Sequence, residues 1–464
     1  MFSTGVPPHA VVAQTIPENT LYLPLVTTSL PKACTNNLAP TPFGVQMYGD
    51  TGSSGKYYAA LADSQAHWVR VEIGWSMIEP NNVAVDQYNW GPADAAVAAA
   101  KDGCLNVVLT IGSAPSWAVG SQGSPEGPLD QTKLTDFAEF LSALTERYDG
   151  DGVNDAPGSP VVNDFEMYNE PDGNDLPLVG HWGKYGAQYA QMLGVASSAI
   201  KAANPNAKIV FGGIAYDAFD DEGGQFVHSF LDDVLTAGGG NAFDVMSFHQ
   251  YPAFRSRWTT GKGPGLREKA ASVRQKLLDH GVNKPIIITE SGWHSSNDDP
   301  NYPSSDENQS RYVVQLFTQS LASNIDMMIW WSLYDVEGFA YADGLVTNGE
   351  PLVRKPSFNV YKIMTAELGS AQYVRTLSNS ETRNADMEAY QFLDANLNQP
   401  LYIAWLDPIE ATGSSALRLV GSVATVRDIH GAVTTVADKD DGKVDQHVVI
   451  SVPGRPVYIR ITQP

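Results

Sequence analysis

Two acidic residues, Glu170 and Glu290, follow apolar runs that lie far apart in the chain. Glu170 belongs to the run DFEMYNEP at 164–171, and Glu290 ends the run PIIITE at 285–290. Each run has the length and the β-forming residues of a short strand. A pair of carboxyl groups at the ends of two strands is what hydrolysis of a glycosidic bond requires. The tripeptide Asn-Glu-Pro can arise by chance, so the surrounding sequence has to show whether Glu170 is functional.

Residues 42–365 alternate short apolar runs with amphipathic helical segments, which is the pattern of repeated β/α units. The predicted strands are Phe43–Met47, Trp68–Ile73, Leu105–Ile111, Asp164–Tyr168, Lys208–Phe211, Phe243–Phe248, Pro285–Thr289 and Asp326–Trp331. Between them, apolar residues recur at helical spacing, as in Leu266–His280, a segment that Gly281 would end. Eight such units favour a closed (β/α)8 TIM barrel of the α/β class over an open sheet.

Beyond about residue 370 the pattern changes to short strands separated by Gly, Asn and Asp turns. The predicted strands are Ala389–Leu393, Leu401–Trp405, Ser415–Val420, Ala424–Asp428, Val448–Val452 and Val457–Ile461. No long helix is predicted among them, which is typical of a small antiparallel β-sandwich. We therefore predict a flexible leader over residues 1–40, a catalytic barrel over 41–368 and an accessory β-sandwich over 369–464.

The active site of a (β/α)8 barrel lies at the C-terminal ends of its strands. Besides the two glutamates, the residues found there are Arg70 on the second strand, Asn169 on the fourth, His249 and Tyr251 at the sixth, and Trp331 on the eighth. Trp117 and Trp293 stand in the loops after the third and seventh strands. We expect these side chains to converge on one cavity.

These residue types suit a glycosidase that retains the anomeric configuration. Such an enzyme uses one carboxyl group as a proton donor and a second, ionised one about 5 Å away as the nucleophile. Tyr and Arg beside the nucleophile keep it charged, through a hydrogen bond and an opposite charge. Burial and a negative neighbour raise the pKa of the other carboxyl group, which then carries the proton. Amides bind sugar hydroxyls, and Trp rings stack on the apolar faces of pyranoses.

Several of the motifs resemble those of clan A retaining glycoside hydrolases. The matching segments are NEP at 169–171, SFHQY at 247–251, TESGW at 289–293, IDMMIWWSLYD at 325–335 and residues 344–361. The likeness is strongest to family 39 and its bacterial polysaccharide-hydrolase relatives, with family 5 next. It spans about residues 42–366.

The resemblance implies a role for each residue at the predicted cavity. Glu170 would be the general acid/base and Glu290 the nucleophile. Arg70, His249 and Tyr251 would orient Glu290 or keep it ionised. No cofactor and no metal ion is implied by this mechanism.

The resemblance also implies how the sugar is bound. Asn169 would bind the hydroxyl at C2, and Trp331 would form the floor of the −1 subsite. The spacing to a later Asp favours Trp331 over its neighbour Trp330 for this role. Trp117 and Trp293 are placed to stack on sugar rings, although packing in the core is an equally good interpretation of each.

The residues by themselves leave other interpretations open. Glu170 and Glu290 could be ordinary exposed carboxylates at strand ends. Arg70 could be a buried ion-pair residue without a role in turnover, and His249 could be structural. Glu79 also precedes a proline, but it follows a loop and is interpreted as structural or as lining a subsite.

The expected reaction is hydrolysis of a β-linked polysaccharide or oligosaccharide by double displacement, in an endo-acting manner. An exo-acting β-glycosidase similar to β-xylosidases is the alternative enzyme, and a catalytically inactive carbohydrate-binding barrel is the alternative from another class. A metal-dependent hydrolase would need clustered His and Asp ligands, which the spacing does not provide. Residues 149–155 have oxygen ligands at alternate positions, but an Asp- and Gly-rich turn is the favoured interpretation because the Glu of an EF-hand is missing.

The amino-acid composition restricts the classes of binding partner and the cellular location of the protein. The net charge of -23 over 464 residues disfavours nucleic acid and anionic membranes and leaves carbohydrate as the expected partner. No apolar run reaches the roughly 20 residues of a membrane span. No Lys or Arg precedes Lys32, so we expect a secreted or cell-surface protein whose export signal has been removed. The two cysteines, Cys34 and Cys104, could form a disulfide or remain free thiols.

Overall fold

The structure is a computed structural model that describes residues 41–48, 55–120, 124–174, 181–252, 258, 265–297, 302–339 and 341–462. The predicted leader over residues 1–40 lies outside the described residues. None of the described helices is both long and apolar enough to cross a membrane.

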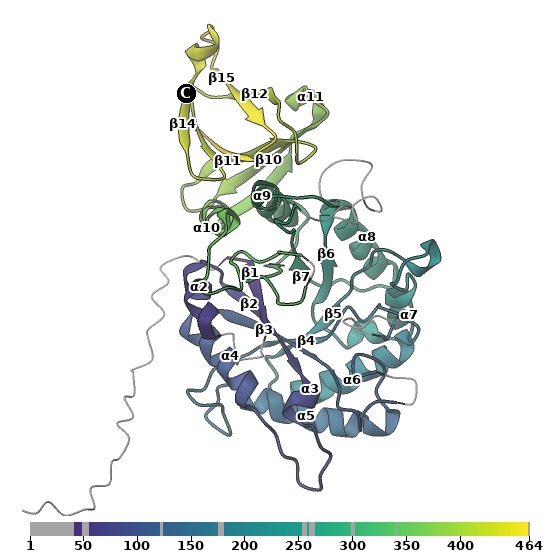
Figure 1. Ribbon diagram of the computed structural model, residues 1–464. Coiled ribbons are helices and arrows are strands. Elements are labelled where there is room, and N and C mark those ends of the chain that lie inside the picture. Colours follow the sequence, from purple (N-terminus) through teal and green to yellow (C-terminus); the bar gives the residue numbers. More distant parts are fainter. Residues whose placement is uncertain are drawn as a thin grey trace, which may run out of the picture. The chain divides into compact units, whose positions relative to one another are not determined.

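Eight parallel strands form one sheet in the order β5-β4-β3-β2-β1-β8-β7-β6 (Figure 1). They are β1 Phe43–Tyr48, β2 Trp68–Gly74, β3 Asn106–Gly112, β4 Asp164–Asn169, β5 Lys208–Gly213, β6 Met246–Gln250, β7 Ile286–Ser291 and β8 Met328–Trp330. Parallel bridges from Val210 to Val245 and from Ile214 to Phe248 join the two outer strands. The sheet therefore closes into the predicted (β/α)8 barrel, and every predicted barrel strand overlaps an observed one.

Amphipathic helices cover the outside of the barrel. They are α2 Tyr58–Asp63, α3 Trp75–Ile78, α4 Gly91–Asp102, α5 Leu134–Arg147, α6 Gly186–Ala203, α7 Phe230–Thr236, α8 Leu266–Asp279, α9 Asp306–Ala322 and α10 Pro356–Leu368, with short 3-10 helices η1 Gly55–Tyr57, η2 Gln131–Lys133, η3 Asp220–Glu222 and η4 Gly239–Asn241. In α5 the apolar stripe Leu134, Phe137, Leu141 and Leu144 is buried, as its helical spacing requires. Strands such as β7 are buried along their whole length because helices lie outside them and side chains fill the barrel inside.

The C-terminal part is the predicted antiparallel β-sandwich. One sheet has the order β14-β13-β16-β11-β10-β9 and the other pairs β12 with β15. The strands are β9 Ala371–Thr376, β10 Met387–Asp394, β11 Gln399–Leu406, β12 Ser414–Val420, β13 Val423–Asp428, β14 Val433–Ala437, β15 His447–Pro453 and β16 Val457–Thr462, with α11 Asn379–Thr382 and η6 Asp438–Asp441 between them. The sequence did not predict β9 and β14. Both are edge strands with mostly exposed side chains, so neither has a buried alternating face to detect.

The larger sheet of the sandwich packs against the barrel. Tyr390, Trp405 and Tyr458 are buried in the same apolar cluster as the barrel core. Arg455 Nε donates a hydrogen bond to Oε1 of Glu307 on α9 at 2.8 Å. The two parts therefore share an apolar contact that polar groups border.

Cys104 is disulfide-bonded. Cys34 is the only other cysteine in the sequence and lies outside the described residues. Of the two states that the sequence left open for Cys104, a disulfide or a free thiol, the structure has the disulfide.

Candidate active site

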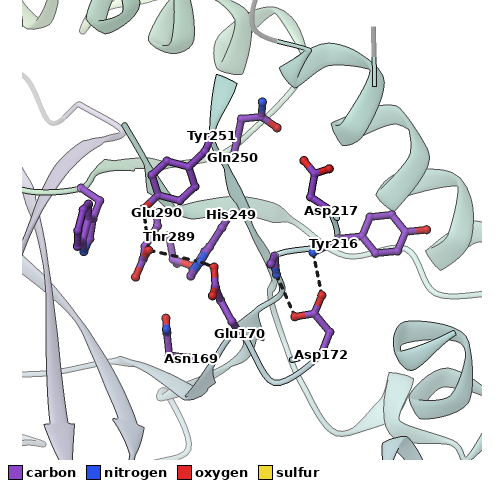
Figure 2. Close-up of polar contacts among 12 residues, drawn as sticks. Asn169, Glu170, Asp172, Tyr216, Asp217, His249, Gln250, Tyr251, Thr289 and Glu290 are labelled. Carbon is purple, nitrogen blue, oxygen red and sulfur yellow. Dashed lines mark hydrogen bonds and ion pairs between the residues drawn. The ribbon is translucent and has the colours of Figure 1, made fainter. Parts of the chain in front are cut away.

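Glu170 and Glu290 meet at the C-terminal ends of β4 and β7. One carboxylate oxygen of each and one ring nitrogen of His249 all lie within 4.8 Å of one another. Tyr168 and Glu170 both have positive φ angles, 68° and 43°, which non-glycine residues adopt at a cost in free energy. This backbone turns the side chain of Glu170 toward Glu290 at the strand end (Figure 2).

A cavity of about 700 Å³ opens at this end of the barrel. Its walls include Asn169, Glu170, His249, Tyr251, Glu290 and Trp331. These residues come from β4, β6, β7 and the segments that follow β4, β6 and β8. Trp293 also lines it, so seven of the side chains that the sequence assigned to the site share one cavity.

Glu290 is held by a cation and a hydroxyl group. Arg70 Nη1 donates to its Oε1 at 2.6 Å, and the Tyr251 hydroxyl donates to its Oε2 at 2.8 Å. A positive charge and a hydrogen-bond donor therefore lie against its two carboxylate oxygens and fix their position. Glu290 is thus equipped to be a nucleophile.

Glu170 has a different environment. Burial raises the pKa of its carboxyl group to about 7, although the positive charges of Lys269 and Arg70 oppose the rise. His249 Nδ1 lies 2.9 Å from Glu170 Oε1 and 3.5 Å from Glu290 Oε2. Burial lowers the pKa of His249 to about 4, so its ring is neutral near pH 7. The structure places His249 nearer to Glu170 than to Glu290, the residue on which the resemblance implied that it acts.

The chain matches a known family over most of the barrel. The model of the cellulase family, glycosyl hydrolase family 5, matches residues 32–336. The chain belongs to glycosyl hydrolase family 5. This family 5 chain is therefore a glycoside hydrolase, and its resemblance to clan A glycoside hydrolases is confirmed. A comparison with curated proteins finds no match.

Solved structures of glycoside hydrolases share the fold of the family 5 enzyme. A family 39 glycoside hydrolase from the gut symbiont Bacteroides cellulosilyticus WH2 is 17% identical with a TM-score of 0.67, over 91% of this chain and 81% of that one. A GH30 endoxylanase from Clostridium papyrosolvens C71 is 13% identical with a TM-score of 0.59, over 92% and 98%. A GH39 β-xylosidase from Caulobacter crescentus is 15% identical with a TM-score of 0.57, over 92% and 98%. At these identities the likeness establishes the fold alone.

Arg70 is the centre of a buried network beneath the cavity. Its side chain is fully buried, and its Nε donates to Glu166 Oε2 at 2.6 Å. Its remaining nitrogens reach Gln46 Oε1 at 2.6 Å and Asn169 Oδ1 at 2.9 Å, in addition to Glu290. Arg70 is thus a buried ion-pair residue and a contact of Glu290 at the same time, so the two interpretations that the sequence kept apart coincide.

Replacing Arg70 by Met is expected to lower the free energy of unfolding of the family 5 enzyme by about 3–5 kcal/mol. The change leaves the buried carboxylates of Glu166 and Glu290 without their cation, which is costly in a dry interior. Urea unfolding followed by fluorescence measures the effect. Arg70→Lys keeps the positive charge but not the planar guanidinium group, so it should lower the free energy of unfolding by less. If the urea unfolding midpoint of Arg70→Met equalled that of the wild type, the network would not have the stabilising role expected of it.

Two of the predicted sugar contacts also reach the cavity wall. Asn169 accepts from Arg70 through Oδ1, so its amide nitrogen remains a donor toward the cavity. The Trp331 ring lines the cavity, and its Nε1 donates to the Tyr48 hydroxyl at 3.0 Å. Trp330 is fully buried instead.

The two loop tryptophans differ. Trp293 lines the cavity, and its Nε1 donates to Ser304 Oγ at 2.8 Å. Trp117 is not among the lining residues and packs edge-on against Trp75, with ring centroids 5.2 Å apart. The Trp75 indole also donates to Glu79 at 2.8 Å, so this second Glu-Pro pair is structural. Of the alternatives that the sequence kept for Trp117, the structure favours core packing.

Several charged residues of the cavity were not predicted from the sequence. They are Glu72, Asp217, Lys269, Glu337 and Asp343. Glu72 could have been found, because it follows Arg70 by two positions on β2 and therefore faces the same side. Burial raises its pKa to about 7, against the nearby charge of Arg70. The other four lie outside the barrel strands, so the alternation of strand residues does not place them.

Among the described residues, two groups have side chains close enough to hold a metal ion. In the group formed by Glu170, His249 and Glu290, a cation would lie beside the guanidinium of Arg70, and the like charge disfavours it. The second group consists of Asp149, Asp151 and Asp155. There, Asp149 and Asp151 accept backbone N–H groups of their own loop at 3.0 and 2.8 Å, as an Asp-rich turn does.

Proposed function

We propose that the family 5 enzyme cleaves β-glycosidic bonds of a polysaccharide or oligosaccharide by double displacement, with retention of the anomeric configuration. The observation that carries this proposal is the approach of the Glu170 and Glu290 carboxylates to within 4.8 Å. Retaining enzymes keep the pair about 5 Å apart, whereas inverting enzymes keep a wider spacing that leaves room for a water molecule. The different surroundings of the two groups support different roles.

In the first step, Glu170 donates its proton to the glycosidic oxygen while Glu290 attacks the anomeric carbon. The bond to the leaving sugar breaks, and a glycosyl ester of Glu290 forms. Arg70 and Tyr251 hold the attacking oxygens in place and balance their charge before the attack. The buried Glu170, with a pKa of about 7, is protonated in a large share of molecules at neutral pH.

In the second step, the ionised Glu170 accepts a proton from water, and the water oxygen attacks the anomeric carbon. The ester bond breaks, and Glu290 is regenerated as a carboxylate. The neutral ring of His249 contacts Glu170 at 2.9 Å and adds no positive charge that would hold Glu170 ionised. Glu170 can therefore regain its proton for the next cycle.

We favour endo-acting cleavage of a β-linked polymer. The cavity is lined by aromatic side chains suited to pyranose rings, among them Tyr48, Trp293, Trp331 and Tyr341. An exo-acting β-glycosidase is the second candidate, because one structural neighbour is named an endoxylanase and another a β-xylosidase. Analysis of product lengths from polymeric substrates separates the two modes.

An extracellular location agrees with the disulfide at Cys104, because such bonds persist mainly in oxidising compartments. In this proposal the enzyme is secreted or displayed on the cell surface and meets carbohydrate outside the cell.

The proposed function is tested by the anomeric configuration of the first product. Proton NMR of a β-linked oligosaccharide during hydrolysis is expected to detect the β-anomer first, followed by mutarotation to the α-anomer. First appearance of the α-anomer would refute the double displacement. Binding of the oligosaccharide without any hydrolysis would instead favour a carbohydrate-binding barrel.

A further inference from the structure

Beyond Glu170, on the side away from Glu290, the cavity wall contains a second charged pair. Asp217 follows β5, and Lys269 stands in the first turn of α8. Both line the cavity, although their exposed fractions are only 3% and 1%. In Figure 2, Glu170 lies between Glu290 and Asp217. No step of the proposed mechanism uses this pair.

The carboxylate of Asp217 is incompletely satisfied. Its Oδ1 accepts from the backbone N–H of Ala218 at 3.0 Å. Its Oδ2 lies 3.5 Å from Lys269 Nζ, which is too long for a strong hydrogen bond. Lys269 directs its own hydrogen bond to the carbonyl oxygen of Ala215. A buried carboxylate whose capacity to accept hydrogen bonds is not filled costs free energy, which a ligand that donates to it can recover.

The backbone around Asp217 is built to hold this side chain in place. The buried carboxylate of Asp172 accepts the N–H groups of Ala215 at 3.0 Å and Tyr216 at 2.8 Å. Tyr216 and Ala218, on either side of Asp217, have φ angles of 46° and 44°. Such angles are unfavourable for non-glycine residues and cluster at functional sites. The segment after β5 thus repeats the strained backbone that presents the glutamate after β4.

Burial raises the pKa of Asp217, while the charge of Lys269 and the indole of Trp258 oppose the rise. The pairing with Lys269 therefore favours a carboxylate, which is the stronger hydrogen-bond acceptor. Pyranose hydroxyls are the donors that a carbohydrate brings into such a cavity. Charge-assisted hydrogen bonds from hydroxyl groups to a carboxylate are short and strong.

The position of the pair points to one part of the substrate. The anomeric carbon must lie against Glu290, and the glycosidic oxygen must lie against Glu170. The sugar that is retained therefore occupies the Glu290 side, next to Trp331. The sugar that leaves must extend past Glu170, toward Asp217.

We propose that Asp217, held in place by Lys269, binds a hydroxyl group of the leaving sugar and gives the enzyme its preference for carbohydrate leaving groups. This inference rests on the glycosidase function proposed above. Asp217 is a binding residue in this proposal, and Lys269 is a positioning residue that acts through it.

The test compares two kinds of leaving group on one glycone. Oligosaccharides of β-linked xylose, glucose or mannose supply a sugar leaving group, and 2,4-dinitrophenyl glycosides of the same glycone supply a phenolate that offers no hydroxyl. In Asp217→Asn and Asp217→Ala, kcat/KM for the oligosaccharide is expected to fall about ten- to a hundredfold. For the aryl glycoside it should change by less than about threefold, because no bond to Asp217 is lost. Glu222→Gln, an exposed change on η3, is the matched control.

The outcomes separate the two proposals. Equal losses on both substrates, or no loss on either, would overturn the assignment of Asp217 to the leaving sugar. Wild-type protein that hydrolyses neither substrate would contradict the proposed function itself. If Asp217→Ala fails to fold, the comparison is made with the nearly isosteric Asp217→Asn. The rate on the aryl glycoside and a thermal melt then show whether that variant is folded.

Discussion

Replacement of Glu290 by Gln is expected to lower kcat by a factor on the order of 10⁴ or more, with the fold intact. An amide cannot form the glycosyl ester, so the first step of the double displacement has no nucleophile. The loss should be similar for oligosaccharides and for aryl glycosides, since both leaving groups depend on the same attack. Hydrolysis of both substrates at matched enzyme concentration measures it, and Glu222→Gln controls for the removal of a carboxylate.

Chemical rescue identifies the role of Glu290 more sharply than the loss of rate. In Glu290→Ala, the missing side chain leaves room for azide against the anomeric carbon. Azide should then displace an activated aryl leaving group directly and give the α-glycosyl azide from a β-glycoside. NMR of the product distinguishes the anomers. A variant at Glu290 that keeps most of the wild-type rate, or a rescued product of β-configuration, would assign the nucleophile elsewhere.

Replacement of Glu170 by Gln is expected to lower kcat/KM for oligosaccharides by about 10²- to 10⁴-fold, because a sugar leaves poorly without a proton. A 2,4-dinitrophenyl leaving group needs no proton, so kcat/KM for that substrate should fall far less. Its kcat and KM should fall together, since the glycosyl-enzyme accumulates when no base activates water. Added azide should restore turnover in Glu170→Ala and give the β-glycosyl azide, the opposite anomer to that expected at Glu290.

The pH dependence of kcat/KM tests the same assignment of Glu170 as the general acid. Glu170 must be protonated to act as the acid, and burial raises its pKa to about 7. The rate on oligosaccharides should therefore be maximal below this value and fall as pH rises through about 7. Glu72 and Asp343 in the same cavity also have pKa values raised to about 7 by burial. The Glu170→Gln variant decides among them, because the alkaline decline must disappear with Glu170 if that residue is the acid.

Much of the candidate site could be predicted from the sequence because the site stands at strand ends. Alternating apolar runs locate β4 and β7, and the barrel rule then places Glu170 and Glu290 on one face. Tyr251 follows from the same rule and contacts Glu290, whereas Arg70 reaches Glu290 from within β2, beneath the cavity.

The surroundings of a side chain are not given by the strand rule. His249 was expected to act on Glu290, but its ring nitrogen lies nearer to Glu170. Trp117 stands in a loop at the predicted rim, yet its ring packs on Trp75 in the core. Spacing along the chain gives the position of a Cα atom at a strand end. It does not give the rotamer or the neighbours that decide which way a large ring turns.

The sequence by itself determined the eight-stranded barrel, the sandwich and the glutamate pair, because burial imposes a local periodicity on strands and helices that any chain of this fold must carry. Only the tertiary structure decided how the two glutamates differ. The pKa of Glu170 depends on how deeply it is buried, and Glu290 is held by Arg70, 220 positions away in the chain. The Asp217–Lys269 pair joins a loop to a helix start. Such contacts arise when distant segments pack, and no local pattern records them.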